Sequence, residues 1–176
     1  MIKILKNVLS EKDWSELNED LNSPTFTWYY QKIVAESDTT DYRTFYFTHG
    51  YINHSSNFAK GINSAWAEKH NRAIGEYLAK YFKKDIDLIW SKANMFTRME
   101  DNYTCGFHTD ITERNDLYTM VYYVNTNNGG TQIQNGPFIP SIKNTAVLMS
   151  CDTMHSTVTQ TDTNIRLNIN FNFKVV

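Results

Sequence analysis

The stretch RLNINFNFKVV, residues 166–176, decides the predicted fold of this chain. Polar and apolar side chains alternate along it, which is the two-residue period of a β-strand. One face is apolar and carries Leu167, Ile169, Phe171, Phe173 and Val175. The other face is polar and carries Arg166, Asn168, Asn170, Asn172 and Lys174. The pattern alone favours a strand whose polar face meets water, and the alternative places Arg166 and Asn168 inside a polar barrel cavity.

Most of the sequence after residue 85 has the same β-strand character. The runs with apolar or alternating patterns are LIWSKANMFTRM (88–99), LYTMVYYVN (117–125), TAVLMS (145–150) and STVTQ (156–160). Turn residues separate them, as in TNNGGT (126–131), where Asn and Gly tolerate positive φ. Many short strands joined by turns predict a barrel or jelly roll, in an α+β chain that is mainly β.

Two helices are predicted, both in the first half of the chain. Residues 10–22 begin with Ser10 as a capping residue and have acids in the first turn. A second helix lies within residues 62–84, and His70 on its apolar stripe is expected in the core. That stripe consists of Trp66, Ala73, Ile74, Tyr77, Leu78 and Tyr81. We expect one domain over residues 1–176, with about 1–90 as supporting helices and early strands and about 90–176 as the β core.

Composition limits the classes of partner and environment. The 176 residues carry a net charge of -2, so no general positive field favours nucleic acid as a partner. No run approaches the roughly 20 apolar residues that span a bilayer, and the first residues lack the features of a signal peptide. We therefore expect a cytoplasmic protein, a monomer or weak homodimer, in which Cys105 and Cys151 are reduced.

A histidine and a carboxylate two positions apart, in GFHTDITERN (106–115), indicate a metal site. In a strand His108 and Asp110 share a face and can hold one cation together. His155 follows the strand TAVLMS and is the best candidate for a third ligand. Two histidines and one carboxylate that leave open positions are typical of non-haem Fe(II) oxygenases. Arg166 lies eleven positions after His155, where a returning strand brings a guanidinium that suits a carboxylate.

These residues, in this order, resemble the Fe(II)- and 2-oxoglutarate-dependent dioxygenases, in particular the prolyl-4-hydroxylase-like branch with its small phage-type members. HTD is similar to the first two ligands of the family. YTMVYYVNTNNGGTQI is similar to a strand that ends in Asn and is followed by a Gly-Gly pair opening the next strand. MHSTVTQTDTNIRLNINF looks like the segment with the distal histidine and the arginine. The resemblance covers roughly residues 90–175.

The resemblance implies a double-stranded β-helix, or jelly roll, with Fe(II) held by His108, Asp110 and His155. It implies that 2-oxoglutarate binds the iron through its 1-carboxylate and 2-keto oxygen, with Arg166 on the 5-carboxylate. Tyr123 matches a position that often hydrogen-bonds that carboxylate, and Asn168, two residues after Arg166, is expected beside the co-substrate.

The implied activity is hydroxylation of an unactivated C–H bond in a peptidyl prolyl or small amino-acid-like substrate. Dioxygen is consumed, succinate and CO2 are released, and ascorbate is a candidate reductant. The alternative from a different class is a non-catalytic jelly-roll binding module, cupin-like or lectin-like, with a structural metal.

A competing metal site uses both cysteines. Cys105-x-x-His108 and Cys151-x-x-x-His155 supply four ligands for a closed tetrahedral zinc site, although the spacings are not those of common zinc modules. More generally, the two cysteines are expected to pack near the metal site.

Other polar residues are weaker candidates for the site. His49 and His54 are candidates for the substrate entrance, and Arg114 for a contact to substrate, although a solvated position is favoured for Arg114. Arg98 and Tyr103 are candidates for a family tyrosine that precedes the first histidine.

Overall fold

The computed structural model describes residues 1–35, 45–53, 61–62, 64–111 and 116–176. His54 and Arg114 lie outside these residues, so their predicted roles are not addressed. The helices are α1 (Glu11–Asn22) and α2 (Ala67–Phe82). The strands are β1 (Ile2–Lys6), β2 (Tyr29–Gln31), β3 (Tyr46–Asn53), β4 (Gly61–Ile62), β5 (Ile86–Thr97), β6 (Leu117–Tyr123), β7 (Gly130–Ile133), β8 (Phe138–Pro140), β9 (Thr145–Ser150), β10 (His155–Val158) and β11 (Ile165–Val175).

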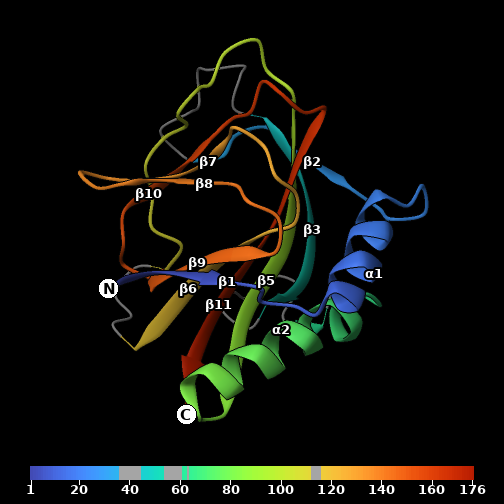
Figure 1. Cartoon of the computed structure of the whole chain (residues 1–176), viewed down its shortest axis with the longest axis vertical. Coiled ribbons are helices and arrows are strands. Elements are labelled where there is room, and N and C mark those ends of the chain that lie inside the picture. Colours follow the sequence, from blue (N-terminus) through green and yellow to red (C-terminus); the bar gives the residue numbers. More distant parts are fainter. Residues whose placement is uncertain (36–44, 54–60, 63, 112–115) are drawn as a thin grey trace.

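The strands form two antiparallel sheets (Figure 1). The larger sheet has the order β1-β9-β6-β11-β5-β3-β2, with β4 paired to β3, and the smaller has the order β10-β7-β8. Apolar residues from both sheets meet in one cluster, in which Val121 and Val147 of the larger sheet join Ile133 and Ile139 of the smaller. The two sheets therefore face each other across a shared interior, as a jelly roll requires.

β11, the strand of alternating polar and apolar residues, lies in the middle of the larger sheet. β11 pairs with β5 on one side and with β6 on the other, so both of its edges are hydrogen-bonded. Most of its polar face is buried: Arg166 and Asn172 are fully buried and Asn168 is 2% exposed, while Asn170 and Lys174 are half-buried. The expectation of a solvated polar face was wrong, because the smaller sheet covers this side of the larger one.

The predicted helices are present and cover the opposite face of the larger sheet (Figure 1). Ser10 caps α1, accepting a hydrogen bond from the Asp13 backbone amide as predicted. Ile74 and Leu78 of α2 pack with Phe171 of β11 in the main apolar core. Among the described residues, neither α1 nor α2 has the combination of length and apolar character that a membrane-spanning helix needs.

His70 is in the core, as predicted, and has polar partners there. The ring is 3% exposed, with its Nδ1 2.6 Å from the hydroxyl of Tyr51 and its Nε2 3.1 Å from a carboxylate oxygen of Asp20. Burial lowers the pKa of His70 below 6.5, although the hydrogen bond and charge of Asp20 act to raise it. The neutral ring therefore donates from Nε2 to Asp20 and accepts at Nδ1 from Tyr51.

The lowered pKa of His70 makes the fold sensitive to acid. Below pH 6.5 the unfolded chain takes up a proton that folded His70 resists, so stability is expected to fall as pH falls through this window. The free energy of unfolding in urea should drop less between pH 7 and pH 5.5 for His70→Gln than for the parent protein. An equal drop in both would show that other groups cause the acid sensitivity.

The two adjacent glycines at the start of β7, Gly129 and Gly130, lie close to the neighbouring strands β10 and β8 of the smaller sheet. A Cβ on Gly130 would stand 2.2 Å from the carbonyl oxygen of Ile139 and 2.9 Å from the ring of Phe138. A Cβ on Gly129 would stand 2.7 Å from the carbonyl oxygen of Val158. Because two of these neighbours are backbone atoms, the chain cannot yield without moving a strand.

Gly130→Ala is therefore expected to destabilise the protein by about 3 kcal/mol. Gly75 in α2 is the matched control, because a Cβ there would meet nothing within 4 Å. Gly75→Ala should stabilise by about 0.5–1 kcal/mol, since alanine is the better helix former. Thermal and urea unfolding of both variants measure the contrast, and a mild effect at Gly130 would contradict the close approach.

Candidate metal centre and co-substrate pocket

His108 and His155 are held side by side by their own backbones. The His108 amide donates to the His155 carbonyl at 2.9 Å, and the His155 amide donates back to the His108 carbonyl at 3.0 Å. The segment before β6 pairs with β10 through two isolated bridges, at Thr104 and at His108, and does not form a regular strand. The prediction of a strand around His108 was thus only partly correct: the segment is extended beside β10, and the chain turns at Asp110.

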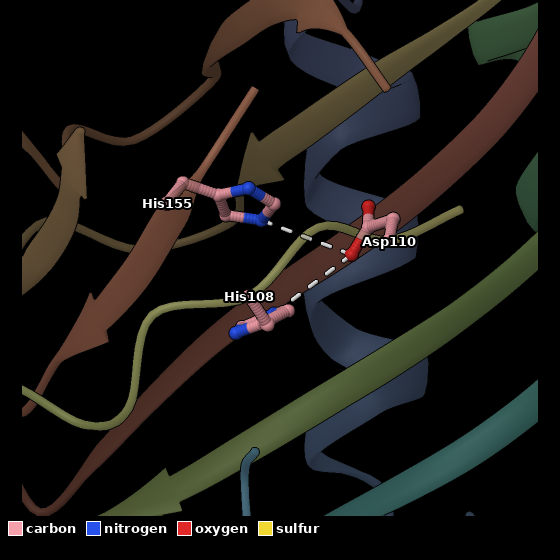
Figure 2. Close-up of side chains that lie close together, drawn as sticks. All are labelled: His108, Asp110 and His155. Atoms are coloured by element: carbon pink, nitrogen blue, oxygen red, sulfur yellow. Dashed lines mark ion pairs between the residues drawn. The ribbon is translucent and has the colours of Figure 1, made fainter. Parts of the chain in front are cut away.

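The side chains of His108, Asp110 and His155 converge (Figure 2). One ligand atom from each lies within 4.8 Å of the others. The Asp110 Oδ1 atom is 3.9 Å from His108 Nε2 and 3.7 Å from His155 Nε2. These separations exceed hydrogen-bond length, as expected for atoms that can surround a cation rather than contact one another.

Each imidazole is oriented by a backbone carbonyl on the side away from Asp110. The Nδ1 of His155 lies 2.8 Å from the Thr153 carbonyl oxygen, and the Nδ1 of His108 lies 3.2 Å from that of Gly106. A carbonyl can only accept, so each Nδ1 carries the proton and each Nε2 keeps its lone pair. Partners of this kind behind a metal-binding histidine fix its tautomer and ring orientation.

Asp110 is oriented in the same way. Its Oδ2 accepts a hydrogen bond of 3.1 Å from the Asn172 amide nitrogen, which also donates to Thr119 at 2.7 Å. Burial acts to raise the pKa of Asp110. Electrostatic interaction with His155, the Asn172 hydrogen bond, His108 and, least, Lys92 outweigh burial and leave the pKa of Asp110 below its usual value. Asp110 is therefore ionised at neutral pH, with Oδ1 free for a cation.

His108 is neutral at the same pH. Burial and the nearby His155 lower its pKa below 6.5, while Asp110 and the Gly106 carbonyl act in the opposite direction and Lys92 adds a small lowering effect. A lone pair on a neutral imidazole and a charged carboxylate are the forms that bind a transition metal. The donor set therefore fits a divalent ion with two nitrogen ligands and one oxygen ligand.

The cysteine-containing zinc site is not assembled. In the described part of the chain, the cluster able to hold an ion consists of His108, Asp110 and His155, and neither Cys105 nor Cys151 belongs to it. Both cysteines are buried thiols. Burial, with some help from Asp152, raises the pKa of Cys151, which disfavours the thiolate form that zinc requires.

Arg166 is a buried guanidinium with few protein partners. It is fully buried; its Nη2 donates to the Gly130 carbonyl at 3.0 Å, and the guanidinium lies 5.0 Å from the centre of the Phe96 ring. Among the described residues, its Nε and Nη1 atoms have no hydrogen-bond partner. Burial lowers the pKa of Arg166 to about 10, so the charge remains at neutral pH. An unpaired buried cation of this kind fits a carboxylate from a bound molecule.

Tyr123 of β6 and Asn168 of β11 lie near Arg166 on two neighbouring strands of the larger sheet. The two residues are directly paired in the β6–β11 register, and Tyr123 donates a hydrogen bond of 2.7 Å to Thr131. Burial raises the pKa of Tyr123 to about 12, against the effects of Thr131 and Arg166. Asn168 accepts a hydrogen bond of 2.8 Å from Asn94. Their predicted part in co-substrate binding remains a prediction that their position permits.

One pocket contains the metal cluster and extends to Asn168 and Thr131, whereas Arg166 and Tyr123 are not among the residues that line it. It is lined by His108, Asp110, His155, Asn168, Asn170, Thr131, Thr157, Val121, Val34, Tyr46, Lys92, Asn94 and Phe96. Sequence reasoning missed Tyr46, Lys92 and Asn94. The available signal was the alternation along β5, which puts Lys92, Asn94 and Phe96 on one face, but their partners on β11 follow only from the strand pairing.

The weaker candidates lie away from this pocket. His49 is buried, with its two ring nitrogens 2.6 Å from the Thr27 carbonyl oxygen and from the Ser64 hydroxyl. Arg98 and Tyr103 are not among the residues that line the pocket. The backbone of Tyr103 instead pairs with Thr159.

Comparison with solved structures identifies the architecture. The chain is similar to an oxidoreductase of the 2OG-Fe(II) oxygenase family from Burkholderia pseudomallei, with a TM-score of 0.71 and 12% identity over 98% of this chain and 84% of the other. It is similar to a prolyl hydroxylase from Trichoplax adhaerens, in complex with a hypoxia inducible factor peptide fragment, with a TM-score of 0.64 and 13% identity over 99% and 83%. It is also similar to HygX from Streptomyces hygroscopicus, with nickel and 2-oxoglutarate bound, with a TM-score of 0.60 and 9% identity over 99% and 83%.

No protein-family model matches the sequence, and no curated protein matches it. At 9–13% identity the structural similarities establish the fold. The chain has the jelly-roll architecture predicted from its strand pattern, in the double-stranded β-helix form that the family resemblance implied. Function has to be argued from the site.

Proposed function

We propose that this protein is an Fe(II)- and 2-oxoglutarate-dependent dioxygenase. Its reaction would be hydroxylation of an unactivated C–H bond in a peptidyl prolyl or small amino-acid-like substrate, with release of succinate and CO2. His108, Asp110 and His155 would hold the iron, and Arg166 would hold the distal carboxylate of 2-oxoglutarate. The bound iron would supply the oxidising chemistry at its open coordination positions.

The observation that carries the proposal is the combination of the metal cluster with the unpaired guanidinium. A structural metal site would explain His108, Asp110 and His155, but it would leave Arg166 buried with two unsatisfied nitrogens. A co-substrate acid explains both features, because one end can bind a metal while the other meets a forked donor. A non-catalytic binding module does not account for this pairing.

The chain's own residues would bind, orient and exclude water. The carbonyls behind His108 and His155 hold the rings in position, and Asn172 holds Asp110. Phe96 and Val121 line the pocket with apolar surface, which limits the water around a bound acid. None of these roles requires a protein group to gain or lose a proton.

Two structural neighbours support the ligand assignment by analogy. HygX carries nickel and 2-oxoglutarate, and the Trichoplax protein carries a peptide. Their identity to this chain is 9% and 13%, so the analogy gives a class of co-substrate and leaves the substrate to be identified.

The decisive experiment is anaerobic spectroscopy of the purified protein loaded with Fe(II) and 2-oxoglutarate. We expect a visible metal-to-ligand charge-transfer band that needs both components, and slow succinate release once air is admitted. Well-folded, iron-loaded protein that gives no band and no succinate would refute the proposal and favour a binding module with a structural metal.

A further inference from the structure

Lys92 is a cation inside the pocket whose role the proposed co-substrate site does not explain. It is half-buried on β5 and lines the same pocket as the metal cluster. Its ammonium donates a hydrogen bond of 3.0 Å to the Tyr46 hydroxyl and lies 4.8 Å from the centre of the Trp90 ring. Among the described residues it forms no ion pair with a carboxylate, so its charge is held by a phenol and two aromatic faces.

The neighbours of Lys92 add hydrogen-bond donors. Lys92 is paired with Asn170 across β5 and β11, and Asn94 is paired with Asn168. The Asn94 amide nitrogen donates to the Oδ1 atoms of both Asn168 and Asn170, at 2.8 and 3.2 Å. Both of these amides therefore turn their oxygens toward β5, and in the described structure their own N–H groups have no protein acceptor. The pocket floor thus offers an ammonium and amide donors together.

Acidic side chains are scarce among the described residues that line this pocket. Asp110 is the only acidic residue among those that line the pocket in the described chain, and its free oxygen faces the metal cluster. Lys92 forms no ion pair among the described residues, and the free oxygen of Asp110 is directed to the metal cluster, so the ammonium and the amide donors favour an anionic ligand group. A lysine suits such a group as a point charge on a flexible stem, whereas Arg166 suits a fixed bidentate geometry.

Lys92 and Arg166 cannot both serve one end of the co-substrate. Lys92 is paired with Asn170, which lies four residues after Arg166 on β11. The backbone positions of the two cations are therefore offset by roughly 13 Å along the strand direction. Arg166 is fully buried at its position, whereas Lys92 is half-buried. The two cations, on β11 and on the neighbouring strand β5, therefore define two separate anion positions.

We propose that Lys92, with Tyr46 and Asn170, binds a carboxylate of the prime substrate. The substrate is then a small free carboxylic acid of the amino-acid type rather than an internal residue of a polypeptide, which has no free backbone carboxylate. The inference rests on the proposed function for the reaction, but the binding site it names does not require iron. Its test therefore begins with binding.

The binding experiment uses metal-free protein and ligand-observed NMR. The probes are the twenty free L-amino acids, their carboxamides and an N-acetylated, C-amidated peptide of proline and glycine. We expect at least one free acid to bind at least tenfold more tightly than its carboxamide, and the capped peptide to show no binding. Carboxamides that bind as well as the acids, or no binding by any free acid, would overturn the proposal whatever the iron chemistry proves to be.

Variants then assign the preference to Lys92. Lys92→Met should weaken binding of the selected acid at least tenfold, Lys92→Arg should retain most of it, and Tyr46→Phe should have a smaller effect. Lys12→Met is the matched control, because the Lys12 side chain is 83% exposed on α1. With iron and 2-oxoglutarate present, Lys92→Met should raise the KM for the acid far more than it lowers kcat.

The affinity for 2-oxoglutarate separates the two anion positions. Titration of the charge-transfer band should give the same Kd for 2-oxoglutarate in Lys92→Met and in the parent protein. A large rise in that Kd would mean that Lys92 binds the co-substrate and would overturn the assignment. Loss of the band in the parent protein itself would instead count against the proposed function.

Discussion

Asp110→Ala is expected to abolish the charge-transfer band and 2-oxoglutarate-dependent succinate release. Asp110 supplies the only negative charge among the three candidate ligands, and the two neutral imidazoles alone offset none of the charge of a divalent ion. Mutating an outer-shell partner of a metal ligand already costs about 10–100-fold in affinity. Losing the ligand itself should therefore cost at least about 100-fold in Fe(II) affinity, measured by anaerobic titration.

Two further variants are compared with Asp110→Ala: one is expected to weaken Fe(II) binding partly, and the other is expected to leave it unchanged. Asn172→Ala removes the hydrogen bond to Asp110 and should weaken Fe(II) binding by an intermediate, roughly 10-fold, amount. Asp87→Ala removes an exposed acid at the other end of β5 and should leave Fe(II) binding unchanged. If Asp110→Ala retained the band while remaining folded, the metal would have to be held elsewhere, and the assignment of the cluster would be wrong.

Arg166→Met is expected to weaken 2-oxoglutarate binding without lowering the free energy of unfolding. The guanidinium is fully buried and two of its nitrogens have no partner among the described residues, so the empty protein bears the cost of an uncompensated charge. Methionine fills similar space without that cost. The free energy of unfolding of the metal-free variant should therefore be equal to or higher than that of the parent protein.

The same substitution should greatly weaken 2-oxoglutarate binding. Removing one partner of a buried charged pair typically costs about 2–5 kcal/mol, so a rise in Kd on the order of 100-fold or more is expected. Arg166→Lys keeps the positive charge but lacks the planar guanidinium, so its Kd for 2-oxoglutarate should lie between those of the parent protein and Arg166→Met. Arg72→Met, on the exposed face of α2, controls for loss of an arginine. A variant that lost stability but kept its affinity would reverse the assigned role and make Arg166 structural.

Much of the fold and of the candidate site was predictable because the signals are local. The two-residue alternation of β11 and the capping serine of α1 are contained in short segments, and both predictions were correct. The joint order of His108, Asp110, His155 and Arg166 carried the site hypothesis; the structure brings the first three together, and the predicted role of Arg166 in co-substrate binding stays a prediction.

The rest depended on neighbours that are distant in sequence. The burial of the polar face of β11 depends on the smaller sheet of β7, β8 and β10. The sequence of β11 alone does not indicate that this sheet covers it. Lys92 lies beside Asn170 and Tyr46 only because strands distant in sequence pair with β5. The edge strand β1 was missed because only Leu5 of its five residues is buried, so its sequence lacks a clear alternation.

Four polar side chains on one face of β11 belong to the proposed co-substrate position, the proposed substrate position and the support of the metal cluster: Arg166, Asn168, Asn170 and Asn172. Sliding this strand by a single residue would turn all four into the apolar core and expose the phenylalanines to the ligands. A partly assembled site is therefore not available. A molecule either has β11 in the native register with all four side chains in the site, or it lacks both the native register and the site. Loss of ligand binding and loss of tertiary structure should consequently coincide in one cooperative transition during chemical denaturation.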